Sequence, residues 1–165
     1  MRLRPTLHHS YSPAQSRCTL DRRLGSASPV EAPEIRTVKA FLFNEKTGQL
    51  DTEDFFTGEH NGGRWNDTAT GAMLVVVELG GPAGQSYGRD GLPSYTVRLN
   101  ASNPRTAKQV FTATRPVTSL SERGTLSVSF LIYPPPCQSL RLVAKVIGRG
   151  AGKAVEQLAG FACGE

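Results

Sequence analysis

Residues 73–79 read Met-Leu-Val-Val-Val-Glu-Leu, a nearly continuous apolar run that is rich in β-branched side chains. Seven residues are too few for a buried helix, and Gly80-Gly81-Pro82 ends the run. Short runs of this composition that stop at Gly or Pro are typical of strands in the middle of a sheet. The stretch therefore predicts the central strand of an all-β protein.

The segments around this run alternate between apolar and polar side chains. Residues 95–101, 126–132 and 140–146 place an apolar side chain at every second position, and residues 35–43 and 109–114 do so less regularly. A period of two indicates strands of a sheet that packs on one face and meets water on the other. The C-terminal segment 151–162 fits both helical spacing and a final strand, and we favour the strand.

This pattern predicts an antiparallel β-sandwich of seven to eight strands over residues 31–165, either immunoglobulin-like or C2-like. Residues 1–30 have no hydrophobic periodicity and are rich in Arg, Ser and Pro, so we expect a disordered basic tail there. Two explanations of the tail stay open, a transit peptide and a start codon placed too far upstream.

Charge is divided unevenly along the chain, whose net charge is +5. Residues 45–67 contain six acids against Lys46 and Arg64, whereas residues 95–153 contain nine Lys or Arg against Glu122. The order of the strands decides whether this asymmetry also exists in space. The basic residues are spread over several segments without the clustered basic-aromatic motif of known nucleic-acid-binding modules, so nucleic-acid binding is not favoured.

The cysteines indicate in which cellular compartment the protein is expected. Cys137 and Cys163 each follow a strand-like segment, and a disulfide between them would close a loop of about 25 residues and contribute roughly 3 kcal/mol. We expect this bridge, and with it a secreted, periplasmic or envelope-associated protein, although the chain as written has no signal peptide and no apolar run that would span a membrane. The alternative is a pair of reduced thiols in a cytoplasmic or organellar protein.

A Ca²⁺ site is one interpretation of the acidic residues that follow residue 50. Carboxylate oxygens are the ligands that Ca²⁺ prefers, and loops at one end of a sandwich often supply them together. The alternative is an acidic loop in contact with water only. No other cofactor is expected, and the candidate ligands are Asp51, Glu53, Asp54 and Asp90.

Ligand binding is expected at two Gly-rich loops, 51–71 and 80–94. Trp65 lies between glycines and polar residues, where an indole can stack on a sugar or a peptide, or can instead close the end of the sandwich. Long loops on a rigid scaffold commonly carry binding residues. The candidate contacts are Trp65, His60, Glu59, Asp67, Tyr87 and Arg89.

These observations favour a non-enzymatic domain that binds a protein, a small ligand or a glycan through the two loops. His60 is the sole histidine outside the tail, and no Gly-x-Ser-x-Gly motif is present. A hydrolase that uses His60 with nearby carboxylates such as Glu59 and Asp67 remains the alternative from a different class. A structural subunit that assembles through its edge strands is a third hypothesis.

Overall fold

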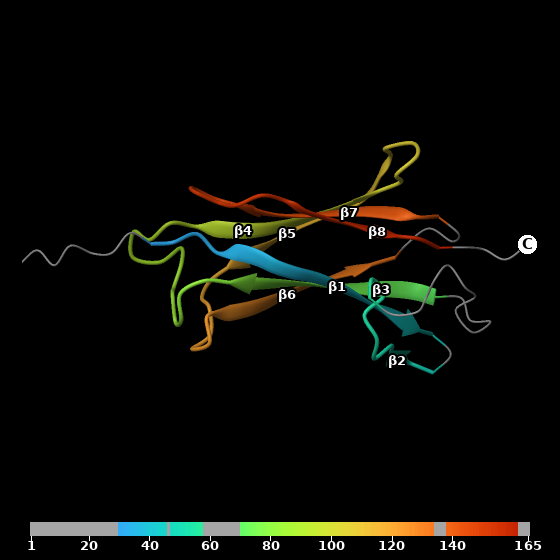
Figure 1. Cartoon of the computed structure of the whole chain (residues 1–165), viewed down its shortest axis with the longest axis horizontal. Helices are drawn as coiled ribbons and strands as arrows, with labels where there is room; N and C mark the ends of the chain where they lie inside the picture. Colours follow the sequence, from blue (N-terminus) through green and yellow to red (C-terminus); the bar gives the residue numbers. More distant parts are fainter. Residues whose placement is uncertain (1–29, 46, 58–69, 134–137, 162–165) are drawn as a thin grey trace, which may run out of the picture.

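A computed structural model describes residues 30–45, 47–57, 70–133 and 138–161, and these residues form two layers of strands without a helix (Figure 1). Each layer is a four-stranded antiparallel sheet. The strands are β1 (Glu34–Asn44), β2 (Gln49–Leu50), β3 (Thr70–Gly80), β4 (Tyr95–Ser102), β5 (Gln109–Val117), β6 (Thr125–Ile132), β7 (Leu140–Ile147) and β8 (Val155–Ala159).

The order of the strands is β2-β1-β3-β6 in the first sheet, here sheet I, and β5-β4-β7-β8 in the second, here sheet II. Apart from the two-residue β2, sheet I contains the first, second and fifth strands, and sheet II the other four. The inner faces of both sheets share one hydrophobic core, so the predicted all-β sandwich is confirmed. The C-terminal segment is a strand, as favoured, because β8 pairs along β7 from Leu140↔Ala159 to Ala144↔Val155.

The core lies between the two inner faces, where the alternating positions of the sequence meet. In β3, the side chains of Met73, Val75, Val77 and Leu79 are fully buried. The inward residues of β1, β4, β6 and β7 pack against them in one hydrophobic cluster. Within the described residues no polar or charged side chain is buried, so burial of apolar surface dominates the stability of the sandwich.

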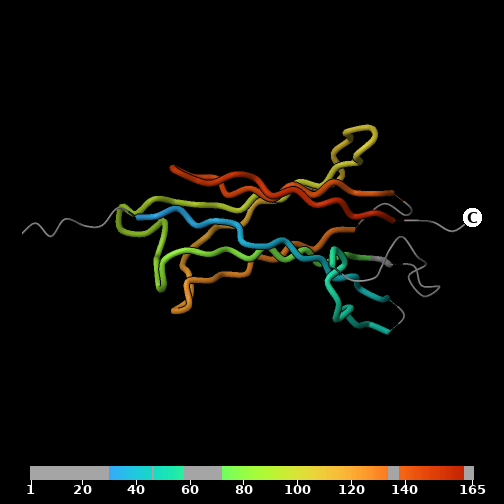
Figure 2. The backbone as a smooth tube through the Cα atoms, viewed as in Figure 1, coloured from blue at the N-terminus to red at the C-terminus, as the bar shows by residue number. Residues whose placement is uncertain are grey.

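The described parts of the two loops expected to bind a ligand lie at opposite ends of the sandwich. Residues 51–57 run beside β1, where Asp51 N–H donates to Leu42 C=O and Phe55 N–H to Ala40 C=O, both at 2.8 Å. Residues 81–94 follow the far end of β3, where Gly80 pairs with Glu34 (Figure 2). Eleven strand residues span roughly 35 Å. The described residues 51–57 therefore lie far from residues 81–94.

The charge asymmetry of the sequence does exist in space. The described residues of sheet I and the segments that adjoin it (30–45, 47–57, 70–80 and 125–133) contain seven acids against Arg36 and Lys39. Those of sheet II and its hairpin loops (95–117 and 138–161) contain eight Lys or Arg against Glu156. One layer of the sandwich is thus acidic and the other basic.

Several predictions fall outside the described residues. The tail 1–29 is one, and both Cys137 and Cys163 are others, so the bridge remains a prediction. The described part of the chain contains no helix of the length and hydropathy that a membrane crossing requires.

Candidate functional site

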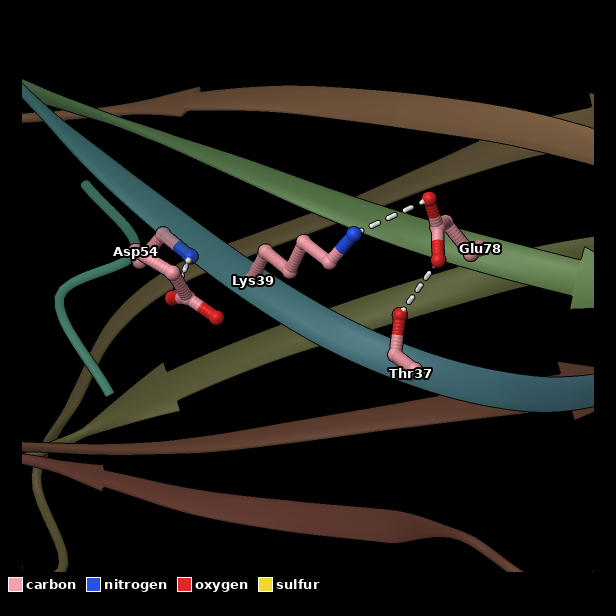
Figure 3. Close-up of polar contacts among 5 residues, drawn as sticks. Thr37, Lys39, Asp54 and Glu78 are labelled. Atoms are coloured by element: carbon pink, nitrogen blue, oxygen red, sulfur yellow. Dashed lines mark hydrogen bonds and ion pairs between the residues drawn. The ribbon is translucent and has the colours of Figure 1, made fainter. Parts of the chain in front are cut away.

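Asp54 stabilises the edge of sheet I in this structure. Its Oδ1 accepts hydrogen bonds from Ala40 N–H at 3.0 Å (Figure 3) and from Phe56 N–H at 3.2 Å. No neighbouring strand among the described residues offers a carbonyl oxygen to Ala40 N–H on this side of β1, so the Asp54 carboxylate takes the place of that backbone acceptor. Asp54 was a candidate Ca²⁺ ligand, but its carboxylate acts here as a cap on β1 and on the turn that follows.

Glu78 is the centre of a polar contact on the outer face of sheet I. Its carboxylate accepts a hydrogen bond of 2.7 Å from the Thr37 hydroxyl and pairs with Lys39 Nζ at 3.2 Å (Figure 3). The hydrogen bond from Thr37, followed by that from Lys39, lowers the pKa of Glu78 below its ordinary value. The three residues link β1 to β3 and remain half-exposed, so their role here is structural.

The four candidate Ca²⁺ ligands do not meet. Asp51 and Glu53 precede Asp54 at one end of the sandwich, and the Asp51 carboxylate accepts a 3.4 Å hydrogen bond from Glu53 N–H. Asp90 has a positive φ of 49° and belongs to the 81–94 loop, which follows the other end of β3. Among the described residues no three His, Cys, Asp or Glu side chains cluster closely enough to hold a metal ion.

Tyr87 is part of the core, in contrast to the prediction that it contacts a ligand. Its side chain is 1% exposed, its hydroxyl donates to Glu31 C=O at 3.3 Å, and its ring packs edge-to-face on Tyr95 at 5.1 Å. Burial raises the pKa of its hydroxyl. The residues around Tyr87 are typical of an exposed turn, but burial of the aromatic ring is favourable. The ring therefore covers this end of the sandwich core. Arg89 is exposed in the same loop and remains a candidate contact.

The other candidate contacts, Glu59, His60, Trp65 and Asp67, lie in the 58–69 segment outside the described residues. Their roles, including that of His60 in the hydrolase alternative, stay predictions.

An apolar groove on the outer face of sheet I was not anticipated as a site. It has a cavity volume of about 530 Å³ and opens to solvent between β1, β2, β3 and β6. Exposed apolar side chains border it: Tyr133 is 70% exposed, Leu131 46% and Leu50 44%. We call it the sheet I groove, and its lining consists of Phe43, Glu45, Gly48, Leu50, Ala72, Leu74, Leu131 and Tyr133.

The register of sheet I explains why the groove is apolar at one end of the sheet. Phe41, Leu74 and Leu131 form one row across β1, β3 and β6, all on the outward side of the pleat. Two rows further along β3, the outward positions are Thr37, Glu78 and Ser127, and the face becomes polar. The signal in the sequence was the outward pair Phe41 and Phe43, which a face in contact with water alone does not require.

Comparisons with known proteins add little to this site. No protein-family model matches the chain, and no curated protein matches it either. Among solved structures, it is similar to a protein described as a "putative beta-galactosidase" from Bacteroides fragilis. The identity is 19%, the TM-score is 0.40, and the match covers 55% of this chain and 14% of the other. A likeness this weak carries no functional argument.

Proposed function

We propose that this chain is a non-catalytic β-sandwich domain that binds an apolar segment of a partner protein in the sheet I groove. The observation that carries the proposal is the exposure of Tyr133, Leu131 and Leu50 together around one groove. Single exposed apolar side chains are common on protein surfaces, whereas a contiguous group around a concave surface is typical of interaction sites.

The lining favours a protein segment over a small molecule. Sites for small molecules usually add a small number of precisely placed polar groups to an apolar lining, and these groups fix the orientation of the ligand. Among the described residues that line the groove, Glu45 is the single charged one, and the other side chains are apolar apart from the Tyr133 hydroxyl. An open apolar groove across several strands suits an extended chain with apolar side chains.

Selection from a phage-displayed library of random twelve-residue peptides tests the proposal. We expect enriched peptides to bind the intact chain and to lose at least tenfold in affinity for the Tyr133→Ser and Leu131→Ser variants. Leu158→Ser is the matched control, since Leu158 is 62% exposed and lies on β8 in sheet II. Enrichment of no peptide, or equal loss of affinity in the control, would overturn the proposal.

We also propose that the domain is exported and that Cys137 and Cys163 form a disulfide. The paired ends of β7 and β8 support this, because Leu140 is opposite Ala159. Cys137 is three residues before the one and Cys163 is four residues after the other, within reach of a bridge. Intact mass after alkylation, with and without reductant, distinguishes the bridge from two free thiols, and two alkylated thiols without reductant would contradict it.

A further inference from the structure

We propose that the outer edge of β6 accepts an extended segment of a partner protein as a fifth strand of sheet I. The segment presents apolar side chains outward, beside Leu131 and Tyr133, and an acidic side chain inward, beside Arg115. This inference rests on the proposed function, because the outward side chains of the added strand would lie beside the sheet I groove.

The other sheet edges carry features that discourage a new strand. Residues 51–57 and β2 cover part of the β1 edge through the hydrogen bonds described above. The β5 edge contains Pro116 and Arg115. The β8 edge is five residues long, and its Glu156 is bound by Arg141 through two hydrogen bonds of 2.6 Å. Short length, Pro and charge are the usual protections of an edge strand.

The β6 edge carries none of these protections. Its eight residues, Thr125–Ile132, include no charged residue, no Pro and no Gly. One side of β6 pairs with β3 in regular register from Thr125↔Gly80 to Ile132↔Met73. In an antiparallel pair, every second residue directs its N–H and C=O away from the partner strand. From Leu126 to Ile132, the N–H and C=O groups that point away from β3 form no hydrogen bond to any described residue.

The pleat of sheet I fixes where the side chains of an added strand would lie. A fifth strand continues the alternation of β6, so every second side chain lies on the outward face next to Leu131 and Tyr133. Those two side chains already border the groove. Main-chain hydrogen bonds would then supply affinity, and the groove would select apolar side chains at alternate positions.

Arg115 determines the chemistry of the inward positions. Its guanidinium carbon lies 5.9 Å from the centre of the Phe130 ring, so it stands at the β5–β6 side of the sandwich. Arg115 is exposed, and no described carboxylate forms an ion pair with it. An acidic side chain opposite the inward face of β6 would meet this cation. A second copy of this chain fits less well, because β6 brings no acid and two Arg115 side chains would approach the same seam.

The test uses a defined probe, an acetylated and amidated ten-residue peptide in which Leu or Val alternates with Glu or Thr. Its controls are the same peptide with Lys in place of Glu and a scrambled peptide that lacks alternation. We expect the Glu peptide to bind best and to slow amide hydrogen exchange at alternate positions of Leu126–Ile132 at least tenfold. Arg115→Glu should reduce affinity for the Glu peptide at least tenfold and improve affinity for the Lys peptide.

Arg98→Glu is the matched control variant, because Arg98 is exposed on the outward face of sheet II and should leave both affinities unchanged. Library peptides that bind the groove without protecting the β6 amides would overturn this inference and leave the proposed function standing. Binding of no peptide in any selection would overturn both. Protection of β6 by all three probes alike would overturn the specified partner chemistry.

Discussion

Truncation of Tyr87 to Ala should destabilise the sandwich strongly. The Tyr87 ring is 1% exposed, packs on Tyr95 and carries a hydroxyl that donates to Glu31 C=O. Removal of a buried aromatic side chain costs about 3–5 kcal/mol, from lost transfer energy and from the cavity that remains. The domain as a whole should unfold at a cost of about 5–15 kcal/mol, so this single change removes a large share of its stability.

Two variants divide that effect into its parts. Tyr87→Phe keeps the ring and removes one hydrogen bond of 3.3 Å, so the expected loss is about 0.5–1 kcal/mol. Tyr133→Ala removes the same side chain from a position that is 70% exposed, and it should change stability by less than about 0.5 kcal/mol.

Urea unfolding followed by far-ultraviolet circular dichroism measures all three variants, with the slope against denaturant concentration unchanged if the transition stays two-state. Equal effects of Tyr87→Ala and Tyr133→Ala would refute the placement of Tyr87 in the core. That result would restore Tyr87 as a candidate ligand contact on the 81–94 loop.

Three further changes test local features by urea unfolding. Asp54→Ala should cost about 1–2 kcal/mol, because two backbone N–H groups lose a charged acceptor; an unchanged midpoint would mean that water replaces the cap. Gly124→Ala should cost more than Gly84→Ala: both glycines have positive φ, near 69° and 66°, but a Cβ at 124 would collide with the carbonyl oxygen of Gly81, whereas 84 has open space. Equal costs would contradict that close approach. Glu78→Gln should reduce the loss of stability below about pH 5, because the lowered pKa of Glu78 stabilises the fold above the ordinary pKa of 4.5 and this contribution is lost as pH falls through the folded pKa. The Glu78 carboxylate is half-exposed, so the difference in stability at pH 7 should stay below about 1 kcal/mol. Parallel pH profiles of the two proteins would contradict the pairing.

Much of the fold could be predicted from residues alone, because burial imposes a strict alternation. The inward positions of β4 and β7, from Tyr95 to Ala101 and from Leu140 to Val146, are buried as their spacing indicates. The C-terminal segment was ambiguous because Ala-rich spacing fits both periods. The segment forms a strand because it pairs with β7, and the local sequence alone does not reveal this pairing.

The candidate site was less predictable, because it depends on strands that are distant in the sequence. Phe41, Leu74 and Leu131 become neighbours only through the register of β1, β3 and β6. Loop composition suggested binding at Tyr87, but it does not reveal that the ring turns inward. The charge asymmetry was visible along the sequence. Its separation into one acidic and one basic layer became clear only once each segment was assigned to sheet I or sheet II.

The most direct test of the binding surface is a titration of ¹⁵N-labelled protein with a library-selected peptide, followed residue by residue in two-dimensional NMR spectra. Binding in the sheet I groove predicts that the largest shift changes occur at Leu74, Leu131 and Tyr133, while the amides of the 81–94 loop and of sheet II stay in place. Shift changes concentrated in the 81–94 loop or on the outward face of sheet II would contradict the assignment of the groove as the binding surface.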